Sequence, residues 1–310
     1  MKKRSRSIKR KNRNASAPGV KSDGINKCGW KYALRKNIAY FLGSSLNPVI
    51  DSYLESFSLL HGSKSIQNSG NTCFEIISHE IEDIILSDIS DIVPDAVSIE
   101  ERRALHRMMD VAKFSVPFLI MLTDPWIGSR LTSWTFDVIK ASARIHLYAR
   151  ILDDAIDEDA SIHRTILLRA QPLFWQATQD LAILAPTLRK ETAEIIQETV
   201  KAVESDNLYP QPLVWGSKNH HLLIAPLLLS GNSSIFLMCR PALSAFIALA
   251  QARDEWGQGV FSDSDVKEAF FKEIPQFLSN ATIELLMSNG WERSAHKLVM
   301  DAQKIMESMR

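Results

Sequence analysis

The spacing of the apolar residues constrains the fold of this chain more than any other feature. From about residue 31 onwards they recur three and four residues apart, while alternating runs typical of strands are scarce. Helices are expected near residues 31–42, 47–60, 72–87, 99–122, 131–157, 161–180, 186–205, 217–230, 234–257, 264–287 and 290–309. Breaks such as Asp124-Pro125 and Gly231-Asn232 separate these segments, and none resembles an interdomain linker. The pattern predicts one all-α domain over residues 31–310.

Residues 1–30 form a segment of different composition. Nine Lys and Arg residues lie between positions 2 and 21, and the first acidic residue is Asp23. The segment lacks the apolar run of a secretory signal, and a run of like charges cannot join a core. We interpret it as a disordered basic tail. The alternatives are organelle targeting, or a tail that binds nucleic acid or anionic lipid.

The overall composition excludes several classes of partner. Lys plus Arg and Asp plus Glu both number 36, so no global field attracts nucleic acid, and nucleic acid is an unlikely partner. The three cysteines, Cys28, Cys73 and Cys239, are far apart and form no CxxC pair, which fits a reducing cytoplasm. Apolar runs such as residues 222–229 fall short of the roughly 18 residues that span a bilayer. We expect a cytoplasmic protein without a transmembrane segment.

An acidic cluster ends the helix expected over residues 131–157. Asp153 and Asp157 lie one turn apart on one face, with Asp154 beside them. Their mutual repulsion costs stability unless a cation neutralises it, so losing Asp153 or Asp154 should leave stability unchanged or slightly higher. Carboxylate oxygens with room for phosphate and water suit Mg²⁺. The alternative is a solvated acidic helix end.

A second cluster lies about a hundred residues downstream. Gln251, Asp254 and Glu255 share a face near the end of the helix expected over residues 234–257, and Arg253 lies among them. Lys218 starts the apolar segment between the two clusters and could offer its charge to a phosphate. Two acid-bearing helices could therefore face one cavity.

These motifs resemble those of the trans-prenyl diphosphate synthases and the wider class I terpene synthase fold. Asp153-Asp154-Ala155-Ile156-Asp157 is similar to the first aspartate-rich motif of that family, and His146 falls at the histidine of its "HxxSLxxDD" helix. Gln251-Ala252-Arg253-Asp254-Glu255 is similar to "FQxxDDxxD", with Glu255 in place of an aspartate.

Two further segments extend the resemblance over roughly residues 105–262. Lys218-Asn219 resembles the Lys-Thr that precedes the second motif. The segment 112–119 is similar to "GKRLRPLL" and keeps Lys113 and Pro117.

The resemblance implies a class I isoprenoid synthase bundle around a central cavity, which ionises an allylic prenyl diphosphate with Mg²⁺. The implied catalytic residues are Asp153, Asp154 and Asp157, which also form the first metal site, while Asp254 and Glu255 form the second. The implied diphosphate ligands are Lys218, Arg164, Arg253 and Gln251, and the implied cavity residues are His146, Tyr148 and Lys113. The resemblance also allows a homodimer.

The sequence departs from the family where isopentenyl diphosphate binds. Phe114 and Val116 replace the two arginines of "GKRLRP", and an apolar side chain cannot make their charge-assisted contacts. Gln258 replaces the third acid of the second motif. We therefore favour a terpene cyclase or a non-elongating prenyltransferase. The alternatives are a chain-elongating synthase, a non-catalytic partner subunit with the same fold, and a basic-tailed nucleic-acid-binding protein.

Tyr148 bears on the length of the substrate. It lies five residues before Asp153, roughly 7.5 Å along the helix. In the family, a bulky aromatic residue there is a floor for the prenyl tail, which implies a C15 or C20 substrate. In the alternative, Tyr148 faces a neighbouring helix and sets no limit.

Overall fold

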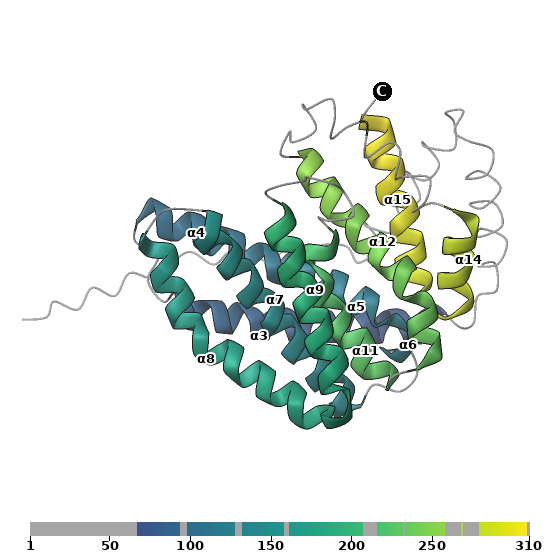
Figure 1. Ribbon diagram of the computed structural model, residues 1–310, viewed down its shortest axis with the longest axis horizontal. Coiled ribbons are helices and arrows are strands. Elements are labelled where there is room, and N and C mark those ends of the chain that lie inside the picture. Colours follow the sequence, from purple (N-terminus) through teal and green to yellow (C-terminus); the bar gives the residue numbers. More distant parts are fainter. Residues whose placement is uncertain are drawn as a thin grey trace, which may run out of the picture. The chain divides into compact units, whose positions relative to one another are not determined.

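A computed structural model describes residues 67–93, 98–127, 132–157, 161–206, 216–231, 233–257, 268 and 279–308 (Figure 1). Helices joined by short turns account for these residues, and none of them lies in a strand, which confirms the all-α prediction. Residues Ser65–Arg310 form one compact unit. The basic tail, the helices expected near 31–42 and 47–60, and most of the helix expected over 264–287 lie outside the described residues.

The helical elements follow one another in the order expected from the apolar pattern. They are α3 (Gln67–Ile92), α4 (Ile99–Asp110), η1 (Val111–Ser115), α5 (Val116–Leu122), α6 (Asp124–Ile127), α7 (Ser133–Asp157), α8 (Ser161–Leu184), η2 (Pro186–Leu188), α9 (Arg189–Asp206), η3 (His220–Leu223), α11 (Ile224–Ser230), α12 (Ser234–Gly257), α14 (Asn280–Ser288) and α15 (Glu292–Ser308).

The helix expected over residues 99–122 is divided by one wider turn. A capping box opens α4, in which Ser98 and Glu101 each accept the other's backbone N–H. The π-helical turn η1 then separates α4 from α5, and its closing bond runs from the Val116 N–H to the Val111 carbonyl. Pro117 follows directly and has no N–H to donate to the Lys113 carbonyl, which explains why the regular pattern fails there. Such turns often accompany functional sites.

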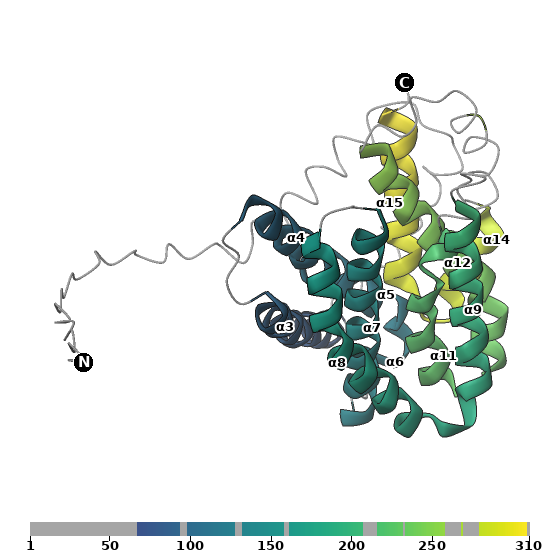
Figure 2. The same cartoon turned by 60° about the vertical axis from the view of Figure 1, so that its left-hand side comes forward.

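Helix α7 is the central element of the bundle. It contacts α3, α4, α5, α8 and α11, and it packs most extensively against α8 (Figures 1 and 2). A two-pronged ion pair ties it to α3: the Arg144 guanidinium donates to both oxygens of Asp88, at 2.8 and 3.0 Å. Both side chains are largely buried. The position of the α7 end, with its aspartates, is therefore fixed by several neighbours.

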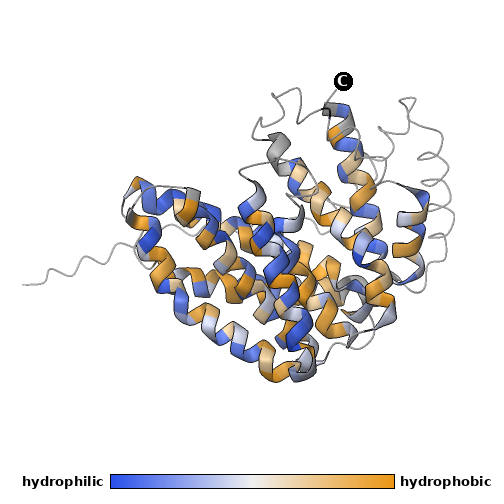
Figure 3. Cartoon of the chain, viewed as in Figure 1, coloured by the Kyte–Doolittle hydropathy of each residue, from blue (hydrophilic) through white to orange (hydrophobic). Residues whose placement is uncertain are grey.

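The most apolar segments lie inside the bundle. Residues 224–229 of α11 are all buried, as expected for a helix that is apolar on every side (Figure 3). One described helix, α12, is long and apolar enough to cross a membrane, over Ser234–Arg253, and more than half of that stretch is buried. Because core helices meet the same criteria, α12 is no clear transmembrane segment.

Helix α15 is held against α5 and α6 by contacts at its start. Trp291 is fully buried and donates its indole N–H to the Leu122 carbonyl at 2.8 Å. Ser294 donates to the Met121 carbonyl, and Arg293 pairs with the buried Asp124. Burial raises the pKa of Asp124, and the Arg293 charge opposes that rise. These contacts set the path of α15 along α12.

Candidate functional site

Two aspartates at the end of α7 share one arginine. Arg150 Nη1 lies 3.3 Å from Asp153 Oδ2, and Arg150 Nη2 lies 3.3 Å from Asp154 Oδ1. The helix produces this contact directly, because side chains three and four residues apart are neighbours. On the other side, Arg107 of α4 donates from Nε to Asp154 Oδ2 at 3.0 Å. Asp154 is buried between two guanidinium groups, whereas the Asp153 side chain is 42% exposed.

The described carboxylates are of a chemical type that suits a divalent cation. The Arg150 guanidinium contacts both Asp153 and Asp154, so the two carboxylates already lie next to the same positive charge. Mg²⁺ prefers one or two carboxylates together with substrate phosphates. Within the described part of the chain, no three His, Cys, Asp or Glu side chains group closely enough to hold a metal. The side chains of Asp157, Asp254 and Glu255 lie outside that part, so the full metal set stays a prediction.

A close helix contact brings the segment around residue 219 against α12. A Cβ on Gly216 would lie 2.6 Å from Ala248 Cβ and 2.9 Å from Ala248 N, so only glycine permits this approach. Three residues later, Asn219 donates from Nδ2 to Gln251 Oε1 at 2.9 Å. Lys218-Asn219 and Gln251, which the sequence predicted to share a site, are therefore neighbours.

The same segment reaches α7 through two histidines. His146 Nδ1 lies 2.7 Å from His221 Nε2, and the rings stack with centroids 5.0 Å apart. Burial lowers the pKa of His221 to about 4. Burial also lowers the pKa of His146 well below its usual value, and the charges of His221 and Arg150 add to that shift. Both rings are therefore neutral at pH 7, and one donates to the other.

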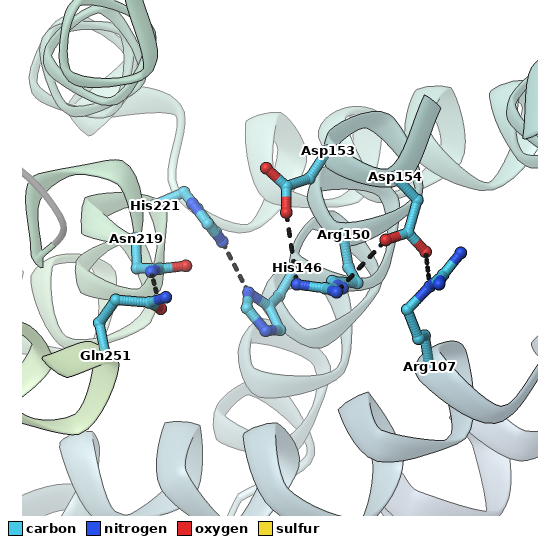
Figure 4. Close-up of polar contacts among 8 residues, drawn as sticks. All are labelled: Arg107, His146, Arg150, Asp153, Asp154, Asn219, His221 and Gln251. Carbon is cyan, nitrogen blue, oxygen red and sulfur yellow. Dashed lines mark hydrogen bonds and ion pairs between the residues drawn. The ribbon is translucent and has the colours of Figure 1, made fainter. Parts of the chain in front are cut away.

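These contacts join α4, α7, the segment around residue 219 and α12, which are far apart in the sequence (Figure 4). A row of side chains runs from Gln251 and Asn219, through His221 and His146, to Arg150, and ends at the two aspartates and Arg107. His146 and Arg150 are one turn apart on α7, so this helix places the histidine pair next to the arginine and its two aspartates. The predicted residues His146, Asp153, Asp154, Lys218 and Gln251 thus lie on connected elements.

Arg253, another predicted diphosphate ligand, forms an ion pair at the end of α12. Its Nη1 lies 3.0 Å from Oδ1 of the buried Asp301 on α15, and Lys297 pairs with the same oxygen. Burial lowers the pKa of Lys297, and the Asp301 charge opposes that shift. Asp301 therefore fixes Arg253 beside Asp254 and Glu255, which continue α12.

The remaining three predicted residues lie on α7, η1 and α8. Tyr148 stacks on Phe174 of α8, with ring centroids 4.4 Å apart, and its hydroxyl accepts from Gln171 at 2.5 Å. This is the alternative in which Tyr148 faces a neighbouring helix. Lys113 is exposed on η1, and Arg164 is exposed in the first turn of α8.

Sequence reasoning missed Arg107, Arg150 and the partnership of His146 with His221. The helical spacing of Arg150 before Asp153 and Asp154 was a visible signal, because side chains three and four positions apart meet. The contacts of Arg107 and His221 left no such signal, since they cross 47 and 75 positions of the chain.

Comparisons of the chain with models of protein families, with curated proteins and with solved structures found no match. The resemblance to the isoprenoid synthases therefore depends on the sequence motifs.

Proposed function

We propose that this protein is a Mg²⁺-dependent class I isoprenoid synthase that ionises an allylic prenyl diphosphate. The observation that carries the proposal is that α7, the segment around residue 219 and α12, which resemble separate family motifs, are linked by the contacts His146–His221 and Asn219–Gln251. On α7, Arg150 lies one turn beyond His146 and contacts both aspartates.

The predicted metal ligands and diphosphate ligands each have a role in this proposal. Asp153 and Asp154, with Asp157, would hold metal ions at the end of α7, and Asp254 and Glu255 would hold metal at the end of α12. Bound Mg²⁺ supplies positive charge that neutralises the leaving diphosphate. Lys218, Arg164, Arg253 and Gln251 would bind the phosphate oxygens, with Arg253 held by Asp301.

The chemical step is heterolysis of the allylic carbon–oxygen bond. The electron pair leaves with the diphosphate, and the organic product is an allyl cation. The neutral pair of His146 and His221 favours this step, because it adds no positive charge near the developing cation. The cation then loses a proton, cyclises or alkylates an acceptor.

The environment of two residues favours a cyclase or a non-elongating prenyltransferase over a chain-elongating synthase. Val116 is 1% exposed and lies in the core, where an arginine could not reach a ligand, and Phe114 is 67% exposed. Val116 and Phe114 therefore do not lie where two arginines could bind one isopentenyl diphosphate together. Elongation remains the alternative that would require other basic residues.

One observation favours a second candidate, a non-catalytic partner subunit with the same fold. Each oxygen of Asp154 is contacted by an arginine, so that carboxylate is neutralised without metal. In this alternative the protein would bind no metal, and its aspartates would serve stability alone. A cytoplasmic homodimer is compatible with both candidates.

The test is incubation of the purified protein and Mg²⁺ with geranyl, farnesyl and geranylgeranyl diphosphate, each with and without isopentenyl diphosphate. The expected result is diphosphate release from at least one allylic substrate, and this release does not need isopentenyl diphosphate. Longer prenyl diphosphates from labelled isopentenyl diphosphate would identify the elongating enzyme. No release from any substrate, by folded protein, would refute the enzymatic proposal.

A further inference from the structure

Arg150 differs from Arg144 of the same helix in how it contacts acids. Arg144 directs two nitrogens to one carboxylate at 2.8 and 3.0 Å, and its side chain is 15% exposed. Arg150 divides two nitrogens between two carboxylates, both at 3.3 Å, and its side chain is 40% exposed. A long, exposed and divided contact is weaker than a two-pronged buried one. Arg150 is therefore the more easily displaced of the two.

The place that Arg150 occupies is the one that a metal would need. It contacts Asp153 and Asp154 at once, and these are the two described carboxylates of the proposed metal site. A divalent cation between them would repel the guanidinium and compete for the same oxygens. Arg107 contacts the opposite oxygen of Asp154, so that carboxylate would stay oriented after Arg150 left.

We propose that Arg150 is an internal counter-ion that occupies the metal position between Asp153 and Asp154, and that it moves onto the diphosphate when metal and diphosphate bind together. The inference rests on the proposed function, because it assumes the metal site. The move replaces two carboxylate contacts with contacts to phosphate oxygens, so no net hydrogen bonding is lost.

The consequence is that metal and diphosphate bind cooperatively. Metal alone must displace Arg150 without a new partner for it, whereas diphosphate provides that partner. By thermodynamic linkage, each of the two ligands must then raise the affinity for the other by the same factor. Arg150 thus links occupation of the metal site to the presence of a diphosphate.

The test measures Mg²⁺ binding to the full chain by isothermal titration calorimetry, with and without inorganic pyrophosphate. Arg150→Gln removes the guanidinium, and Arg150→Lys keeps the charge but cannot bridge two carboxylates. Lys140→Gln is the matched control, because Lys140 lies on α7 and pairs with Asp137 at the same three-residue spacing. Circular dichroism establishes that each variant is folded.

In Arg150→Gln we expect Mg²⁺ alone to bind about tenfold more tightly than in the wild type, as expected for removing a nearby like charge. The enhancement of Mg²⁺ affinity by pyrophosphate should fall at least fivefold, with Arg150→Lys in between and Lys140→Gln unchanged. Equal Mg²⁺ affinities in wild type and Arg150→Gln, or no Mg²⁺ binding by either, would overturn the inference. Cooperative binding without turnover of any allylic diphosphate would support it while refuting the proposed function.

Discussion

His146 and His221 form a 2.7 Å hydrogen bond between α7 and η3, with Nδ1 of the first ring facing Nε2 of the second. Such a bond requires that one of the facing nitrogens carry a proton and the other carry none. A second proton between the two facing nitrogens would place two donors in contact in a buried position. The link between the two segments is therefore sensitive to acid.

The first prediction concerns stability in acid. The pKa of His221 is about 4 in the folded protein and near 6.5 in the unfolded chain, so the unfolded chain binds more protons between these values. The free energy of unfolding should be unaffected above pH 6.5 and should fall as the pH drops towards 4, by about 3 kcal/mol from this group. Urea unfolding at a series of pH values measures the fall.

Two variants separate the histidine pair from general acid effects. His221→Gln should reduce the pH dependence between 6.5 and 4, while the buried His146 still contributes to it. His79→Gln removes a histidine whose side chain is 80% exposed and should leave the dependence as in the wild type. The same slope in all three proteins would contradict the prediction.

The second prediction concerns the two aspartates, and it revises an expectation from the sequence. Repulsion within the cluster predicted that neither replacement would reduce stability. However, Asp154 is buried between Arg107 and Arg150, so Asp154→Ala should lower the free energy of unfolding by about 2 kcal/mol. Asp153→Ala, at a half-exposed position, should change it by less than about 0.5 kcal/mol.

Both alanine variants should still lose diphosphate release, because each removes a metal ligand. Thermal unfolding and product assays on the same preparations test the two effects together. Equal stabilities would mean that Asp154 is not held by the arginines, and full activity in both variants would exclude the metal assignment.

The third prediction concerns Tyr148. Because its ring stacks on Phe174 and its hydroxyl accepts from Gln171, Tyr148→Phe should cost about 1 kcal/mol of stability. Tyr148→Ala should leave the ratio of kcat/KM for geranylgeranyl and farnesyl diphosphate within about twofold of the wild type. Loss of a side chain that contacts the substrate would change this ratio by more than that, roughly tenfold or more. A clear gain for the longer substrate would restore Tyr148 as the floor of the cavity.

The fourth prediction concerns Gly216. A methyl group there would contact the backbone of α12 at Ala248, so Gly216→Ala must move the 216–221 segment away from that helix. We expect a loss of stability of about 2 kcal/mol and a weaker Asn219–Gln251 contact. Gly231→Ala is the control: its φ of 59° is strained for alanine, but nothing lies within 4 Å of the added Cβ. It should cost about 1 kcal/mol and leave Mg²⁺ binding unchanged.

The amino-acid sequence by itself determined the helices and the local clusters. Apolar spacing predicted α12 over residues 234–257, as observed, because a helix that buries one face needs that period. The adjacency of Asp153 and Asp154 was likewise fixed by helical geometry. The sequence did not predict the π-helical turn η1 within residues 99–122, because the apolar pattern is continuous there and only Pro117 interrupts the regular hydrogen bonding.

Only the tertiary structure decided what these local clusters contact. Arg107 reaches Asp154 from α4, His221 reaches His146 from η3, and Tyr148 turns to α8. Local periodicity specifies which face of a helix is apolar, but it does not specify which neighbour covers that face. The packing of whole helices selects the neighbour, because side chains distant in sequence meet only after the bundle has formed. That packing gave Asp154 a second positive partner, Arg107, in addition to Arg150 of its own helix.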